Sequence, residues 1–147
     1  MLANFLPIIY ISHIMVQRKG KIVIPPGCNI WPHELETAKA LANFGHTIEF
    51  KKKIEGYKVH SADAFVDGIL WEFKAPDGGK IDIVERNLRR AKIQSGHVVF
   101  DSKRVKKIPD AAIKREILAK APLIKDICAV IFVDRKRRCI DIYKKKA

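Results

Sequence analysis

Hydrophobic residues recur along the chain with two different periods, and these periods divide it into helices and strands. Helical spacing, bounded by proline, glycine or a capping residue, predicts three helices, at Pro32–Phe44, Ile81–Gln94 and Asp110–Lys120. Alternating or continuous apolar runs predict strands at Ile22–Ile24, Thr47–Lys52, Tyr57–Val66, Ile69–Ala75, His97–Asp101, Asp126–Asp134 and Arg138–Lys144. Elements in this order favour an α/β sandwich around a mixed central β-sheet.

One turn sets the register of the central predicted hairpin. Asp67-Gly68 suits a two-residue type I′ turn, because glycine and aspartate tolerate the positive φ angles that such a turn needs. With these two residues as the loop, Asp63 lies opposite Glu72, and Lys74 projects from the same sheet face. Two adjacent carboxylates and an ammonium group cost stability unless a cation lies between the carboxylates. The hairpin therefore predicts a metal-dependent hydrolase site; the alternative is an exposed, ion-paired strand.

The first predicted helix offers a third carboxylate. At about 100° per residue, Glu34 falls within the apolar arc that contains Leu41, whereas Glu36 points nearly the opposite way. A charged residue on a packing face needs a physical reason, and a shared metal ion is one. Glu34 can equally lie at the rim and cap the helix N-terminus, where negative charge is favourable. Glu36 is expected to be solvated.

The length of the chain, 147 residues, suits one domain with an ordinary core. Residues 1–26 read as an N-terminal apolar arm or strand, which Pro25-Pro26-Gly27 separates from a single domain at residues 27–147. The apolar start lacks a basic flank and is too short to cross a bilayer comfortably, so no membrane span is expected. A degenerate signal segment is the alternative for this start.

The number and spacing of the cysteines indicate the redox environment of the protein. Cys28, Cys128 and Cys139 are odd in number and form no Cys-x-x-Cys pair. A structural zinc site or a disulfide framework is therefore not expected, and reduced thiols in a reducing compartment are.

A strong positive charge points to the class of partner. The chain carries 29 Lys and Arg against 16 Asp and Glu, a formal net charge of +13, which favours polyanions and nucleic acids above all. Ribosomal and membrane-surface proteins share such a composition. The candidate phosphate contacts are Arg86, Arg89, Arg90, Lys92, Lys103, Arg104, Lys106 and Lys107. Any one of them taken alone is more often a solvated surface charge.

Together these residues resemble a known nuclease pattern. Glu34 on an opening helix, Ala62-Asp63, and then Glu72-Phe73-Lys74 after a hairpin resemble the PD-(D/E)xK nucleases, with alanine where the motif has proline. Three longer runs are similar to the C-terminal tRNase domain of bacterial contact-dependent growth-inhibition toxins: HELETAKALANFGHTIEF, HSADAFVDGILWEFKAP and RNLRRAKIQSGHVVFD. The resemblance covers about residues 32–101 and continues more loosely to the end.

The resemblance implies a role for each motif residue. It implies a divalent cation held by Glu34, Asp63 and Glu72, with the Phe73 carbonyl as a further ligand. Lys74 would orient the attacking water and stabilise charge on the scissile phosphate. Gln94 resembles a helix-end glutamine that binds the phosphate or Lys74. Oxygen ligands favour Mg²⁺, with Mn²⁺ or Zn²⁺ as alternatives.

The resemblance further implies a restriction-endonuclease-like α/β fold and a metal-dependent endonuclease that cleaves RNA, with tRNA as the expected substrate. A DNA endonuclease of the same fold and a non-catalytic basic nucleic-acid-binding protein are the alternatives. The expected partners are tRNA and a cognate immunity protein, and the expected place of action is the bacterial cytoplasm.

Overall fold

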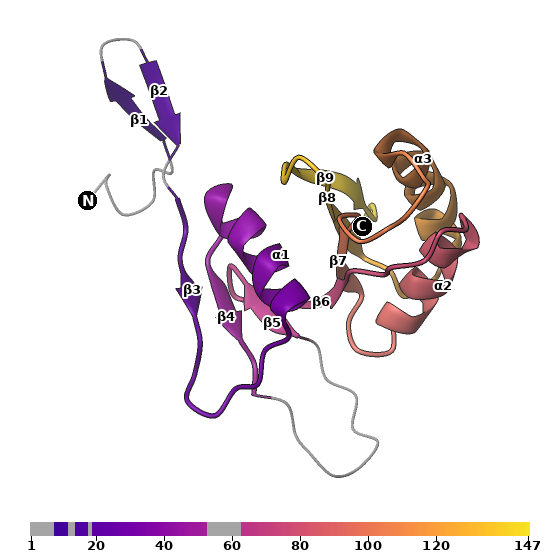
Figure 1. The fold of residues 1–147 in the computed structure, drawn as a ribbon, viewed down its shortest axis with the longest axis horizontal. Helices are drawn as coiled ribbons and strands as arrows, with labels where there is room; N and C mark the ends of the chain where they lie inside the picture. Colours follow the sequence, from indigo (N-terminus) through magenta and orange to yellow (C-terminus); the bar gives the residue numbers. More distant parts are fainter. Residues whose placement is uncertain (1–7, 12–13, 18, 53–62) are drawn as a thin grey trace.

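The computed structural model describes residues 8–11, 14–17, 19–52 and 63–147. Within them, the helices are α1 (Pro32–Asn43), α2 (Asp82–Ala91) and α3 (Asp110–Lys120), followed by a 3₁₀ turn at Ala121–Leu123 (Figure 1). The strands are β1 (Ile8–Ile11), β2 (Ile14–Gln17), β3 (Ile22–Val23), β4 (Ile48–Phe50), β5 (Ala64–Val66), β6 (Ile69–Lys74), β7 (His97–Asp101), β8 (Ala129–Val133) and β9 (Cys139–Lys144). None of the described helices is long and apolar enough to cross a membrane.

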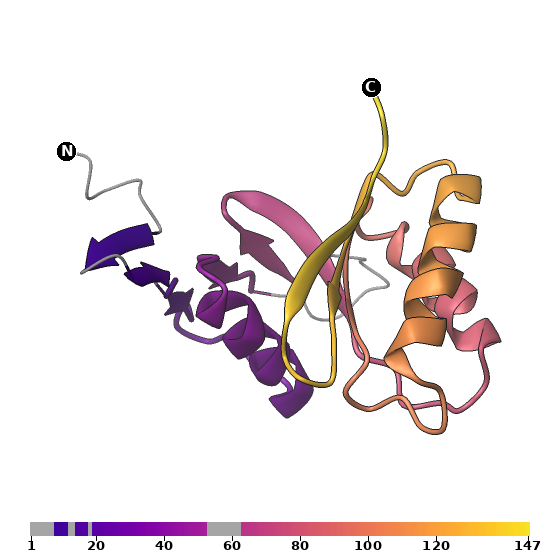
Figure 2. The ribbon, with the colours of Figure 1, turned by 90° about the horizontal axis from the view of Figure 1, so that it is seen from above.

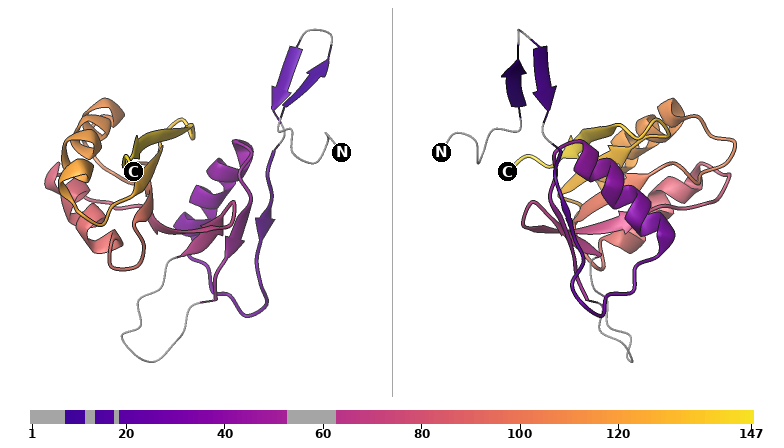
Figure 3. Two further views of the ribbon diagram at one scale, coloured as in Figure 1. Left: turned by 180° about the vertical axis from the view of Figure 1, so that it is seen from behind. Right: turned by 60° about the vertical axis from the view of Figure 1, so that its left-hand side comes forward.

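The central sheet is mixed, as the order of the elements predicts. Its described strands run β3-β4-β5-β6-β7-β8-β9. The neighbours β6, β7 and β8 are parallel, with α2 and α3 as the connections between them, and β3 is parallel to β4 across α1. The β4–β5, β5–β6 and β8–β9 neighbours are antiparallel. The β1–β2 pair forms a separate two-stranded sheet that stands clear of this body in both views of Figure 3.

Helices cover both faces of the sheet. Helix α1 lies on one side, and α2 and α3 lie together on the other (Figure 2). Alternate residues of β7 pack on opposite faces of the sheet. Val98 and Phe100 are buried between the sheet and helices α2 and α3 (the α2/α3 core), whereas Val99 is buried between the sheet and α1 (the α1 core). The same alternation in β6 turns Trp71 and Phe73 toward α1. The residues between and after them, Glu72 and Lys74, therefore face the α2/α3 side.

The turn at Asp67-Gly68 has the predicted conformation. Both residues have positive φ, 50° and 87°, and the strands pair as Ala64↔Trp71, Phe65↔Leu70 and Val66↔Ile69. The Asp67 carboxylate also accepts a hydrogen bond from the Thr47 backbone N–H at 2.8 Å and contacts the His46 ring at 2.7 Å. Asp67 is thus a turn residue that ties the hairpin to the start of β4, as its position in the sequence indicates.

The predicted ends of several elements need correction. Helix α2 spans Asp82–Ala91, so Ile81 precedes it and is exposed, and Gln94 lies in the turn that follows it. Helix α3 has the predicted bounds, Asp110–Lys120, and Pro109 is its N-cap. The carboxylate of Asp110 accepts hydrogen bonds from Arg135 and Ser102, which a local sequence pattern does not connect with it. Residues 57–62 of the predicted first hairpin strand lie outside the described residues.

A buried carboxylate, Asp101, joins three segments at the end of β7. Its oxygens accept hydrogen bonds from the Thr37 hydroxyl of α1 at 2.7 Å and from both terminal nitrogens of Arg137 at 2.8 Å. Arg137 lies in the β8–β9 turn and also donates to the Glu36 carbonyl at 3.3 Å. The hydrogen bonds to Asp101 raise the pKa of the Arg137 guanidinium above its ordinary value, against the opposite effect of burial. The basic β8–β9 turn therefore acts as a clamp, because Arg137 holds the end of β7 and α1 together.

We expect Arg137→Asn to lower the free energy of unfolding by about 3 kcal/mol, because it leaves the buried Asp101 charge without its bidentate partner. Asparagine tolerates the positive φ of position 137, 65°, so the loss reports the ion pair and not backbone strain. The matched control is Lys136→Asn, which removes an exposed charge from the same turn and should change the free energy by about 0.5 kcal/mol or less. Urea denaturation measures both, and equal losses would contradict the clamp.

Candidate active site at the end of the β5–β6 ladder

Asp63 lies where the paired part of β5 begins. Its backbone N–H donates to the Trp71 carbonyl at 3.2 Å, and its carboxylate accepts the Phe73 backbone N–H at 2.8 Å. A side-chain oxygen thus occupies the position that a strand carbonyl would take next to Phe73. Because the N–H and C=O of one strand residue point to the same side, the Phe73 carbonyl faces this position as well. The end of the ladder therefore brings two oxygen donors together.

Glu72 and Lys74 flank Phe73 and share the opposite sheet face from it. The Lys74 ammonium lies 3.4 Å from Oε2 of Glu72, and their neighbours in the parallel ladder are Val98 and Phe100. Glu72 and Asp63 are each only 6% exposed. Two buried carboxylates and one lysine therefore lie close together. Glu72 and Lys74 are on β6, and Asp63 is the residue directly before β5.

Glu34 occupies the first turn of α1 and is also 6% exposed. Its Oε1 accepts the backbone N–H of Trp31 at 3.0 Å, so it caps its own helix, which is one of the two roles its position suggests. Glu36 instead lies at the surface with Lys39 and Lys103. Hydrogen bonds from Lys39 and then Lys103 lower the pKa of Glu36 below its ordinary value. The expected contrast in burial between the two glutamates is therefore confirmed.

The donor chemistry suits a hard cation in part. Among the residues that the structure describes, no three His, Cys, Asp or Glu side chains are grouped closely enough to hold a metal ion. Asp63, Glu72 and the Phe73 carbonyl nevertheless offer oxygen donors at one level of the sheet. Mg²⁺ is commonly held by one or two carboxylates, with water and substrate phosphate completing its shell. These donors fit that mode, and membership of Glu34 in the set stays a prediction.

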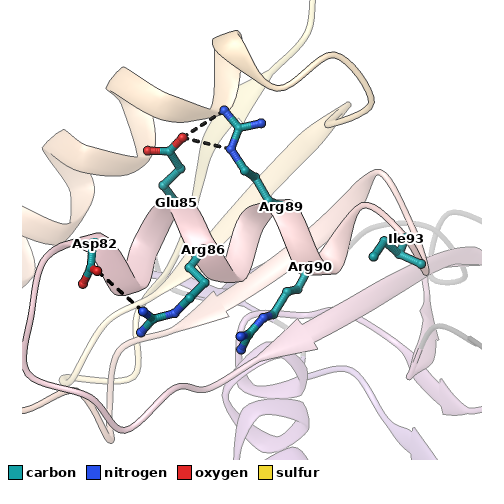
Figure 4. A pocket seen from close by; sticks show the side chains of 6 residues that line it. All are labelled: Asp82, Glu85, Arg86, Arg89, Arg90 and Ile93. Carbon is teal, nitrogen blue, oxygen red and sulfur yellow. Dashed lines mark hydrogen bonds and ion pairs between the residues drawn. The ribbon is translucent and has the colours of Figure 1, made fainter.

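The predicted phosphate contacts fall into two groups. On the outer face of α2, a shallow hollow of about 410 Å³ is lined by Asp82, Glu85, Arg86, Arg89, Arg90 and Ile93 (Figure 4). Arg86 pairs with Asp82 at 3.5 Å and Arg89 with Glu85 at 2.9 Å. Within the described part of the chain, Arg90 has no ion pair, and neither has Lys92 at the end of this helix. The second group lies in the connection after β7 and consists of Lys103, Arg104, Lys106 and Lys107.

The structure also shows an aromatic feature that the sequence pattern did not single out. Trp31 directly precedes α1 and is 64% exposed, and its ring lies nearly parallel to that of His33. The neighbouring hollow, about 140 Å³, is lined by Pro32, His33, Glu36, Asp101, Lys103 and Arg104. Helix periodicity gives no signal for it, because position 31 extrapolates to the apolar arc that contains Leu41, whereas Trp31 precedes the helix and its side chain is exposed. Gln94, by contrast, places its Oε1 in the interior.

A mixed seven-stranded sheet lies between α1 and the α2/α3 pair, and this fold is also found in a solved structure. The protein matches a chain of the solved CdiA-CT/CdiI toxin and immunity complex from Burkholderia pseudomallei with a TM-score of 0.63 and 21% sequence identity. The match covers 82% of this chain and 97% of that chain. A comparison with curated proteins gave no match.

Residues 60–138 match the contact-dependent growth inhibition CdiA C-terminal domain family, and this span is more than half of the sequence. The chain therefore belongs to the CdiA C-terminal domain family, whose members are toxins of bacterial contact-dependent growth inhibition. The family match includes Asp63, Glu72 and Lys74 but begins after α1.

We expect Glu34→Gln to weaken Mg²⁺ binding by about 10- to 100-fold if its carboxylate joins Asp63 and Glu72 around the cation. Glu36→Gln removes the same charge two residues further along α1, at the surface, and should leave the affinity unchanged. Isothermal titration with Mg²⁺ measures both affinities, and thermal melting without the ion measures the helix cap separately. A lower melting temperature with unchanged Mg²⁺ affinity would show that Glu34 is a cap alone.

Proposed function

We propose that this toxin domain is a metal-dependent endonuclease of the PD-(D/E)xK type that cleaves RNA, with tRNA as its substrate. One observation carries the proposal. The carboxylates of Asp63 and Glu72 are buried on neighbouring strands at the end of the β5–β6 ladder, with the Lys74 ammonium 3.4 Å from Glu72. Burying two carboxylates and one ammonium in so small a volume costs stability, and a cation in the reaction complex would offset that cost.

The residues of the site divide the work of phosphodiester hydrolysis among them. A bound Mg²⁺ would lower the pKa of an attacking water and neutralise charge on the scissile phosphate. Asp63, Glu72 and the Phe73 carbonyl would hold the ion, while the hydrogen bond from Phe73 N–H fixes the rotamer of Asp63. Lys74 would orient the water and stabilise the negative charge that develops on the phosphate oxygens. Its ion pair with Glu72 keeps the ammonium at this level of the sheet.

The charge of the chain and its relatives support the proposed substrate and partners. A net charge of +13 supports a polyanionic substrate, and the choice of tRNA rests on the resemblance of the sequence to tRNase toxins. The solved structure with the same fold is a toxin and immunity complex, which supports a cognate immunity protein for this chain. Action in the cytoplasm of a bacterial target cell agrees with such a substrate.

Lys74→Ala should abolish cleavage while leaving RNA affinity within about twofold of the parent, because this lysine acts in the transition state and not in docking. Total tRNA and plasmid DNA are each incubated with both proteins, with Mg²⁺ and with EDTA, and filter binding in EDTA gives the affinities. Normal cleavage by Lys74→Ala would refute the metal-nuclease mechanism. Cleavage of DNA with tRNA spared would keep the nuclease and refute the tRNase, and binding without cleavage by the parent would favour a non-catalytic binder.

Arg90→Ala should weaken RNA binding several-fold and lower the slope of log affinity against log salt by about 1, since this guanidinium is available for a phosphate. Arg89→Ala is the matched control, one residue earlier on the same helix and equal in charge change. Glu85 accepts from both Nε and Nη2 of Arg89 at 2.9 Å, a two-point contact that a phosphate displaces less readily than a single long one, so this variant should bind more nearly as the parent does. Filter binding at several salt concentrations compares them, and a larger effect of Arg89→Ala would show that phosphates displace Glu85.

A further inference from the structure

Trp31 has the exposure of a binding residue. Its side chain is 64% exposed although tryptophan is the largest apolar side chain, and the second tryptophan of the protein, Trp71, is buried in the α1 core. An exposed tryptophan presents about 200 Å² of apolar surface to water, which favours a partner that covers it. Trp31 is not a member of the α1 core, which gathers around Ala38 and Leu41.

The ring of Trp31 is also held in a defined place. Its backbone N–H donates to the buried Glu34 carboxylate, and its ring lies at 17° to the ring of His33 with centroids 6.5 Å apart. Pro32 follows at once and fixes the backbone where the helix opens. An aromatic plane in a fixed orientation loses little conformational entropy when a second flat ring stacks on it.

Two cations stand beside this aromatic pair. Lys103 and Arg104 line the hollow of about 140 Å³ that His33 also lines. Both cations are in exposed ion pairs, with Glu36 at 3.4 Å and Asp77 at 3.6 Å, and exposed pairs of this kind contribute little and exchange readily. The buried carboxylate of the hollow, Asp101, is already neutralised by Arg137. A phosphate can therefore replace the surface carboxylates at Lys103 and Arg104.

We propose that Trp31 and His33 form a stacking platform for an unpaired nucleobase of the RNA substrate, with Lys103 and Arg104 binding the adjacent phosphates. Aromatic stacking beside cations is the usual way in which proteins hold single-stranded nucleotides, and a base inside a duplex has no free face for it. The platform rests on the proposed function, which it deepens by naming a single-stranded segment of RNA as the part recognised. It lies at the end of α1 that carries Glu34, next to the end of β7.

The test measures binding in EDTA, where cleavage does not occur. A labelled single-stranded RNA oligonucleotide and a duplex RNA of the same length are titrated with the parent, Trp31→Ala, Trp31→Phe and Leu123→Ala. Leu123 is the matched control, an apolar side chain 71% exposed on the 3₁₀ turn after α3. All variants keep the backbone N–H that Glu34 binds, and thermal melting confirms that they fold.

We expect Trp31→Ala to weaken binding of the single strand about tenfold while changing duplex binding less than about twofold. Trp31→Phe should recover part of the loss, Leu123→Ala should have no effect, and the single strand should quench the fluorescence that Trp31 contributes. Equal losses for both RNAs, no loss with Trp31→Ala, or the same loss with Leu123→Ala would overturn the platform.

The platform and the nuclease can fail separately. If the parent cleaves neither RNA nor DNA in Mg²⁺, the nuclease proposal fails, while selective loss of single-strand binding in Trp31→Ala still supports the platform. If the parent cleaves RNA normally and Trp31→Ala binds the single strand as the parent does, the nuclease stands and the platform fails.

Discussion

The hydrogen-bonded pair of Asp101 and Arg137 is the constraint on which the arrangement of the layers depends. It fastens the end of β7 to the β8–β9 turn, and through the Thr37 hydroxyl and the Glu36 carbonyl it fastens both to α1. A buried ion pair is not a strong net stabiliser, but losing one partner is costly, so the pair selects a single position for α1. Glu34 and Trp31 belong to that helix end, and their places relative to the sheet depend on this one carboxylate.

The sheet itself decides where chemistry is possible. The β5–β6 ladder is antiparallel, whereas β6 and β7 are parallel, and Asp63 stands where the paired part of the former begins. Its carboxylate satisfies a strand N–H that would otherwise lack a carbonyl, so the residue is structurally required whatever else it does. Placing Glu72 beside Lys74 on one face lowers stability as well, because the Glu72 carboxylate is buried and the Lys74 side chain is only partly exposed. The burial of the Asp63 carboxylate has a structural explanation, whereas the burial of Glu72 beside Lys74 is the feature that points to function.

Sequence patterns predict what is local and miss what is distant. The Asp67-Gly68 turn determines the register of its hairpin, and helix periodicity separates Glu34 from Glu36, because both depend on neighbours within a few residues. Arg137 pairs with a carboxylate 36 residues away in the sequence, and Arg135 pairs with one 25 residues away. The local run of basic residues therefore does not show that two of these side chains form ion pairs with distant residues. The bonds of Asp110 escape a local pattern for the same reason. In the candidate site the hairpin turn predicts that Asp63 lies beside β6, whereas periodicity leaves open whether Glu34 caps its helix or faces the site, because that depends on how α1 packs.

The basic residues that attract a polyanion at long range are not all residues that can bind its phosphates. Arg135, Arg137 and Arg138 each bind a carboxylate within 2.8 Å, so each pair is neutral as a whole and offers no free guanidinium to a ligand. Long-range attraction depends on the net charge of +13, to which every cation without a partner contributes wherever it lies, and salt weakens this attraction. Close contact with a phosphate requires a cation that lies beside the bound ligand and whose partner is absent or easily displaced, as, among the described residues, Arg90 does on α2 and Lys103 does after β7. The rate of encounter with a polyanion therefore depends on all the unpaired cations, whereas the place where it binds depends on a smaller set of them.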